Sequence, residues 1–242
     1  IEATGLVKAT AADGVGLQTS GDLNIDKITA GTAAHNVASG GGNVRLRAGG
    51  DIIDTYTDSV SAVSALGHLI LVSDNGSIYG ENPATPAEDG SDPFRIQLTP
   101  TGAFSAEVQV LLDVLQVQND IGSVAVNDLF VSRVDAGGNG DVFIETEQGS
   151  IVVGKILNAD AVTLTSAASI DDYFDDDDAP VANIYFVNYA YLISSGGDSG
   201  QNSNFIEVDL RTELNTTAQG DIFINSLSDV FVRYLESVDG DV

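Results

Sequence analysis

Cysteine, methionine and tryptophan are absent from the 242 residues, and basic residues are scarce, with 9 Lys and Arg against 36 Asp and Glu. Without cysteine, neither a disulfide scaffold nor a zinc site built on thiolates can form. The formal net charge of −27 argues against nucleic acid as a partner, because binding to a phosphate backbone needs Lys and Arg to displace its counterions. The same charge disfavours an anionic lipid surface.

Long apolar runs are also missing. No stretch approaches the roughly 20 residues that a membrane span requires, so we expect no membrane insertion. A hydrophobic content of 43% nevertheless predicts a folded chain with a buried core. Residues 1–5 carry no targeting signal, and residues 240–242 resemble the opening of another strand. We therefore expect residues 1–242 to form one domain, excerpted from a longer repetitive protein.

A short unit recurs along the chain: glycine, a small polar residue, then apolar residues in alternation. Its copies begin, in full or in part, at Gly21, Gly42, Gly50, Gly67, Gly76, Gly122, Gly140, Gly149 and Gly220. Several neighbouring copies are separated by 8 or 9 residues and others by 18 to 21. A short unit at near-constant spacing is typical of a repeat architecture.

Each copy has the pattern of a strand with its turn. Alternation buries one face of a strand, and glycine beside Asp, Asn or Ser supplies the positive φ and the local side-chain hydrogen bonds of a turn. Residues 108–117, where helical spacing competes, are rich in Val and alternate, so they also favour strands. We predict an all-β chain, a single parallel β-helix solenoid, right-handed, with loop insertions. At ~20 residues per coil it has roughly 10 to 12 coils and is a rod about 50–60 Å long. The predicted inward-facing residues include Leu23, Ile25, Val44, Leu46, Val142, Ile144, Ile222 and Ile224.

Residues 41–52, Gly-Gly-Asn-Val-Arg-Leu-Arg-Ala-Gly-Gly-Asp-Ile, resemble the repeat of filamentous-haemagglutinin-like exoproteins, and residues 139–156 and 161–170 are similar. The resemblance implies a right-handed β-helix in the extracellular space or on a bacterial cell surface, often an adhesin delivered by two-partner secretion or autotransport. A cysteine-free chain is compatible with that location. The Asn-Pro-rich motifs of the family's secretion domain are missing, and Asn82-Pro83 does not replace them. The chain would then be a middle portion of the rod.

Three segments interrupt the repeats: residues 80–93, 171–180 and 194–204. The first contains three prolines among acidic residues, and proline cannot donate a hydrogen bond to a β-ladder. We expect all three to be loop insertions. In repeat proteins, function tends to reside in such insertions.

The second interruption is an acidic run with six carboxylates in eight residues. They belong to Asp171, Asp172, Asp175, Asp176, Asp177 and Asp178. Hard divalent cations prefer oxygen ligands, and calcium is the commonest extracellular choice. The EF-hand spacing and the nonapeptide calcium repeat are both absent. Two interpretations stay open: a calcium site at these six residues, or a solvated acidic loop. No cofactor is required in either case.

An aromatic segment, residues 184–193, precedes the third interruption. If Ile184 and Phe186 point inward, alternation turns the neighbouring side chains outward. Those neighbours are Tyr185, Val187, Tyr189 and Tyr191. An exposed stripe of this kind could stack on sugar rings or on a partner protein, which makes the three tyrosines candidates for a ligand surface. Alternatively, the polar residues 194–204 fold back and cover it.

An enzymatic role finds little support among the residues. Pectin-degrading lyases of the β-helix type use clustered basic residues, and nine basic residues scattered over the chain do not suggest such a cluster. Polygalacturonase-type hydrolysis needs carboxylates with His and basic residues nearby, and the order and basic motif of that family are not matched. His35 and His68 are the only histidines, and we interpret both as structural or solvent-facing.

We therefore expect no enzyme, but a structural or adhesive rod segment of a large secreted or cell-surface bacterial protein: a stalk, adhesin or filament subunit. Its expected partners are neighbouring coils or subunits of the same protein, and cell-surface glycans or proteins. The alternative is a polysaccharide-binding or polysaccharide-degrading β-helix enzyme. Ice binding, a third role of solenoids, would need a regular Thr-x-Thr ladder, and only isolated pairs occur.

Overall fold

The structure is a computed structural model that describes residues 5–32, 34, 41–55, 62–80, 94–98, 103–108, 114–119, 128–146, 148–173, 182–202 and 204–242. Every regular element in these residues is a strand, so the predicted all-β class is confirmed. The first eleven strands are β1 (Val7–Ala11), β2 (Val15–Gln18), β3 (Leu23–Ala30), β4 (Val44–Ala48), β5 (Ile52–Asp54), β6 (Val63–Ala65), β7 (Leu69–Ser73), β8 (Ile78–Gly80), β9 (Phe94–Leu98), β10 (Ala103–Val108) and β11 (Val114–Asn119). The others are β12 (Leu129–Thr146), β13 (Ile151–Ser166), β14 (Ile170–Asp172), β15 (Ile184–Ser194), β16 (Ile206–Ala218), β17 (Ile224–Ser226) and β18 (Phe231–Ser237). The described part contains no helix that is long and apolar enough to cross a membrane.

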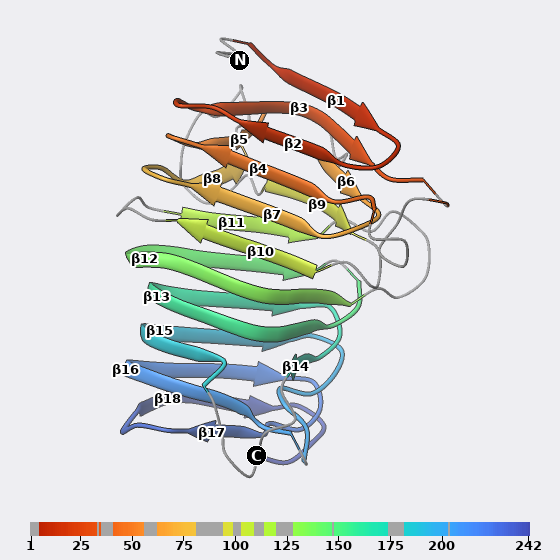
Figure 1. Cartoon of the computed structure of the whole chain (residues 1–242). Helices are drawn as coiled ribbons and strands as arrows, with labels where there is room; N and C mark the ends of the chain where they lie inside the picture. Colours follow the sequence, from red (N-terminus) through yellow and green to blue (C-terminus); the bar gives the residue numbers. More distant parts are fainter. Residues whose placement is uncertain are drawn as a thin grey trace.

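The strands lie one above another in a stack, with the two chain ends at opposite ends of it (Figure 1). All pairings between the named strands are parallel, as predicted. One ladder of paired residues runs without a break through Ala9, Ile28, Val63, Ile96, Asn119, Thr146, Ser166, Ser194, Ala218 and Ser237. We call it the long ladder and each of its residues a rung. At about 4.8 Å per step it spans about 43 Å.

The number of residues between rungs is not constant, and the expected period of about 20 residues is wrong. Successive rungs are 19 residues apart from Ala9 to Ile28 but 35 apart from Ile28 to Val63. Strand residues must stay in register, whereas the connections at the corners can lengthen, because the entropic cost of closing a loop rises slowly with its length. The number of residues between rungs therefore depends on the length of the connections at the corners more than on the length of the strands.

Alternating side chains fill the interior of the stack. Seven of the eight predicted inward-facing residues are at most 5% exposed: Leu23, Ile25, Val44, Leu46, Val142, Ile144 and Ile222. Ile224 is only partly buried, although it packs against the core. Near the end of the described stack, Val232 and Leu235 are 45% and 37% exposed. They continue the register of the buried Leu214 and Thr216 from β16 to β18.

The small polar residue of the repeat unit connects one repeat to the next. Its side-chain oxygen accepts a hydrogen bond from the backbone N–H of the equivalent residue in the following repeat. In the C-terminal half this polar ladder runs from Asp128 to Ser150 (2.8 Å), Ser169 (3.3 Å), Asp198 (3.1 Å), Asp221 (2.8 Å) and Asp241 (2.6 Å). In the N-terminal half it runs from Asp22 to Asp51 (3.0 Å) and Ser77 (2.7 Å).

The preceding glycine is explained by the same contact. A Cβ atom at this position would overlap the accepting oxygen of the previous repeat. This holds at Gly50, Gly76, Gly197, Gly220 and Gly240. None of these five has a positive φ. The expectation of a positive φ is therefore wrong for these five glycines, where the glycine makes room for a side chain that lies about one repeat earlier in the chain. It is confirmed at Gly42 and Gly149, whose φ angles are 73° and 80°.

Candidate functional site

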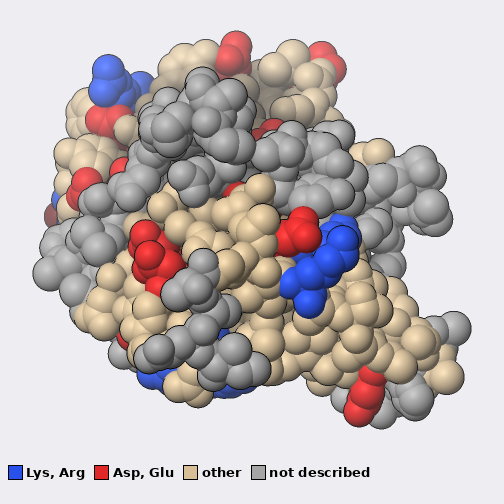
Figure 2. Space-filling model, turned by 90° about the horizontal axis from the view of Figure 1, so that it is seen from above, with Lys and Arg blue, Asp and Glu red and all other residues tan. Residues whose placement is uncertain are grey.

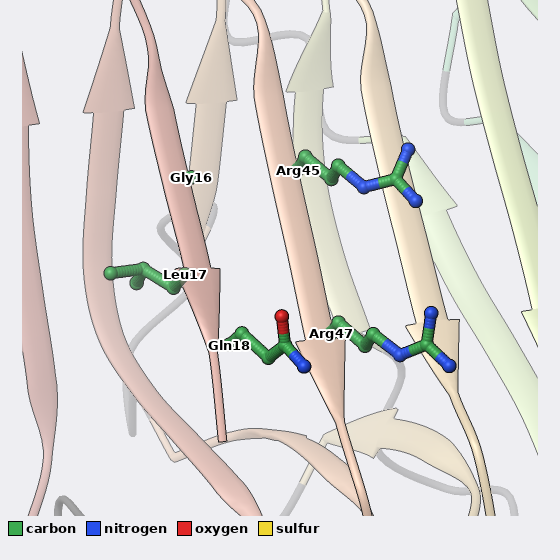
Figure 3. A pocket seen from close by; sticks show the side chains of 5 residues that line it. All are labelled: Gly16, Leu17, Gln18, Arg45 and Arg47. Carbon is green, nitrogen blue, oxygen red and sulfur yellow. The ribbon is translucent and has the colours of Figure 1, made fainter. Parts of the chain in front are cut away.

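A hollow lies on the outer face of β2 and β4, with a volume of about 290 Å³. Gly16, Leu17 and Gln18 line it from β2, and Arg45 and Arg47 line it from β4. Gly16 pairs with Arg45, and Gln18 pairs with Arg47. Residues two apart on a strand share a face, so the two guanidinium groups extend side by side from β4, while Gln18 points from β2 towards them (Figure 3).

The two arginines differ in what they can bind. Arg47 donates two hydrogen bonds to Asp74, at 3.0 and 2.7 Å, so its charge is already matched. Arg45 is exposed, and no acidic side chain in the described part forms an ion pair with it. Seen from the end of the stack, basic side chains lie beside acidic ones and do not form a continuous basic face (Figure 2). Within the part of the chain that the structure describes, the hollow therefore offers one guanidinium without an ion pair, suited to a single carboxylate or a sugar hydroxyl.

Sequence reasoning missed this hollow, although a signal was present. The order Arg45-Leu46-Arg47 within an alternating strand places two arginines on one face. The strand that lies beside them could not be known without the pairing of β2 with β4. His68 is exposed, and its backbone N–H donates to Asn43 at 2.8 Å, while His35 lies outside the described residues.

The described part of the acidic run is β14, where Asp171 and Asp172 face opposite sides of the strand. Asp171 is half-buried and accepts a hydrogen bond from Gln201 at 3.2 Å. Asp172 is 6% exposed and accepts one from the buried Asn183. Asn183 also donates to the carbonyls of Val153 (3.1 Å) and Gly154 (3.2 Å). Asp172 thus belongs to a buried polar network.

The rest of this run, Asp175 to Asp178, lies outside the described residues. No group of three His, Cys, Asp or Glu side chains arranged to hold a metal occurs where the structure is described. Calcium binding at the run stays a prediction. Of the other interruptions, residues 81–93 are not described, and the polar run 194–204 contributes Ser199 to the stack, where it bridges Ile170 and Ile222.

Burial raises the pKa of Asp171 above its ordinary value of 3.8; the hydrogen bond from Gln201 opposes the rise, and the carboxylates of Asp128 and Asp198 add to it. Because the folded state holds this proton more tightly than the unfolded state, ionised Asp171 opposes folding at neutral pH, and the penalty is lost as pH falls through the raised pKa towards 3.8.

We expect Asp171→Asn to raise the melting temperature at pH 7 and low ionic strength. The gain should vanish below pH 3.8. Thermal melts of both proteins across this range test it, and an equal gain at all pH values would contradict the electrostatic cause.

The aromatic segment forms β15, and its side chains do not alternate as expected. Phe186 is 49% exposed and Val187 is fully buried, so the predicted inward Phe186 and outward Val187 are both wrong. Phe186 has a φ of 56°, and the register with β16 shifts between Tyr185 and Val187. This extra residue reverses the faces of Phe186 and Val187, and a second register shift, between Val187 and Tyr189, restores the expected faces. The three candidate tyrosines, Tyr185, Tyr189 and Tyr191, are each half-buried on the outer side.

The left-handed backbone at Phe186 is repeated on the neighbouring strand, β13. Leu157 pairs with Tyr185, and the next residue on β13, Asn158, has a φ of 57°. The corner therefore requires a left-handed residue in both strands. Asparagine adopts this conformation readily, whereas a bulky side chain is strained there by about 1–3 kcal/mol. Asn158 also donates to Asp135 at 2.9 Å, which fixes its corner.

Phe186 instead contacts two side chains on the outer surface, Tyr185 and Arg211. Its ring centroid lies 5.1 Å from that of Tyr185, at an interplanar angle of 59°. The guanidinium carbon of Arg211, on β16, lies 5.6 Å from the Phe186 ring centroid. An aromatic pair contributes about 0.5–1.5 kcal/mol and an exposed cation–π contact about 0.5–1 kcal/mol. These gains at best offset the strain, so stability alone does not account for phenylalanine at this corner.

Comparison with known proteins does not supply a relative: no family model, no curated protein and no solved structure matches the chain.

Proposed function

We propose that the chain is a rod segment, a right-handed parallel β-helix, of a large secreted or cell-surface bacterial protein, where it acts as a stalk, adhesin or filament subunit. The observation that carries the proposal is the long ladder, which keeps one strand direction and an unbroken chain of pairings from Ala9 to Ser237. Each repeat contacts only its neighbours in such an architecture, which extends a protein without requiring a single central core.

The surface location rests on the repeat itself. Residues 41–52 support a place among filamentous-haemagglutinin-like exoproteins, and the polar ladder gives the Gly-Asp, Gly-Asn and Gly-Ser pairs of such repeats a physical role. Further coils or subunits of the same protein are the proposed partners at the ends of the stack. Val232 and Leu235, which are exposed in register with core residues, support that proposal.

A polysaccharide-binding or polysaccharide-degrading β-helix is the second candidate. The hollow with Arg45 favours it, because a guanidinium and the Gln18 amide beside a shallow depression suit a sugar acid. At about 290 Å³ the hollow holds little more than one sugar unit. Among the described residues it holds only one positive charge without an ion pair, too few to bind a uronate polymer, which the net charge of −27 would also repel.

Electron microscopy together with a turnover screen tests the proposal. We expect elongated particles and no product from polygalacturonate or from neutral glycans. Turnover that disappears in Asp171→Asn or Asp172→Asn would support the enzymatic alternative and contradict the rod. A compact particle would contradict the β-helix itself.

A further inference from the structure

The corner formed by Tyr185, Phe186 and Arg211 carries an inference beyond a structural rod. Phe186 occupies a left-handed backbone position for which asparagine, present at the equivalent Asn158, is the better residue. Half of its side chain faces solvent, and the contacts of its ring are to Tyr185 and Arg211, which are themselves on the outer surface. An aromatic residue held at a strained, exposed position is a feature of binding sites more than of folds.

We propose that Tyr185, Phe186 and Arg211 form a platform that binds a neutral sugar unit. The proposal deepens the adhesive role given above and rests on it. The apolar face of a sugar ring would pack against the Phe186 ring, as apolar groups pack on exposed aromatic surfaces. Arg211 would donate hydrogen bonds to the sugar hydroxyls, and its guanidinium carries several donors in a fixed geometry.

Charge selects among possible ligands at this corner. The net charge of −27 repels polyanions and disfavours acidic glycans. A cationic side chain from a protein partner would meet Arg211, which already lies over the Phe186 ring. A neutral ligand encounters neither repulsion. Carboxylate and amide groups surround the corner: Asp209 pairs in register with Tyr185, and Asn188 donates to Asp160 at 2.6 Å. Such groups are hydrogen-bonding partners for hydroxyls.

Phe186→Asn separates binding from folding, because we expect it to weaken sugar binding without lowering the stability of the fold. Relief of backbone strain should leave the melting temperature unchanged or raise it by about 2–4 °C. Loss of the ring should weaken sugar binding by about tenfold or more. Arg211→Gln should weaken binding while changing the melting temperature little. Phe231→Asn removes a phenylalanine that is 66% exposed on β18 and serves as the matched control, with binding unchanged.

The probes are neutral oligosaccharides of glucose, mannose and galactose, with polygalacturonate as the acidic comparison, titrated by NMR against the full chain and each variant. Binding of at least one neutral probe, lost in Phe186→Asn but kept in Phe231→Asn, is the expected result. The proposal is overturned if no neutral probe binds, if polygalacturonate binds more tightly, or if Phe186→Asn lowers the melting temperature. Elongated particles without sugar binding would defeat this platform and leave the rod intact, whereas turnover dependent on Asp171 would defeat the rod and leave the platform intact.

Discussion

Replacing Ile144 with Asp is expected to unfold the stack around β12. Ile144 is 1% exposed and lies in register between Val117 on β11 and Leu164 on β13. A carboxylate at this position would have no cationic partner in an apolar file, and an uncompensated buried charge costs about 3–5 kcal/mol in addition to the lost packing. That is a large part of the whole stability of a domain, which is about 5–15 kcal/mol.

Urea unfolding and hydrogen exchange measure this effect. Because each repeat contacts only its neighbours, protection should fall first in β12 and β13 and later in β3 and β4. Thr163→Asp is the matched control, since Thr163 is half-buried on the outer side of β13 and its replacement should change stability by about 0.5 kcal/mol. Equal losses in the two variants would mean that the inward file is not the core.

The strand class and the buried file could be predicted because both depend on local alternation. An apolar residue at every second position identifies a buried face whatever the strand pairs with, and residues such as Val142 and Ile144 have their expected burial. The order of strands in the stack follows once connections are short and pairing is parallel. No comparable pattern in the sequence indicates how long each connection is, so the uneven spacing of the rungs could not be predicted.

The faces of Phe186 and Val187 were predicted incorrectly because one backbone angle controls them. The left-handed residue at Phe186 shifts the register between Tyr185 and Val187, so Phe186 and Val187 change sides relative to simple alternation. A second shift, between Val187 and Tyr189, returns the later residues of β15 to their expected faces. No local rule places a bulky phenylalanine in that conformation. The signal that could have helped is Asn158, a residue type that favours it, but its relation to Phe186 depends on the pairing of β13 with β15.

The hydrogen bonds of the repeat unit were also misassigned, for a related reason. A glycine followed by Asp is a common local turn, and sequence alone does not distinguish it from a glycine that makes room for a distant oxygen. The oxygen above Gly220 belongs to Asp198, 22 residues earlier in the chain. Contacts between repeats are long-range in sequence, so they follow only from the register.

Gly220→Ala is expected to lower stability through that one contact, by about 1–3 kcal/mol. The added Cβ would collide with Oδ1 of Asp198, which accepts the hydrogen bond from the backbone N–H of Asp221 at 2.8 Å. The φ at Gly220 is not positive, so alanine is not strained by the backbone itself. Displacing the carboxylate leaves the Asp221 N–H without its acceptor, which is the cause of the loss.

A double-mutant cycle measured by urea unfolding isolates this cause. Asp198→Ala removes the same hydrogen bond and should cost about 1–3 kcal/mol, but it also removes the atom with which the Cβ added at Gly220 would collide. Adding Gly220→Ala to Asp198→Ala should therefore cost almost nothing. Asp198→Asn keeps an acceptor oxygen in place, so the glycine replacement should retain its full cost in that background. If the two replacements were additive in the Asp198→Ala background, the glycine would be needed for its backbone and not for the passage of the Asp198 side chain. The repeat unit would then be a set of local turns after all, and neighbouring repeats would be joined only by their backbone hydrogen bonds.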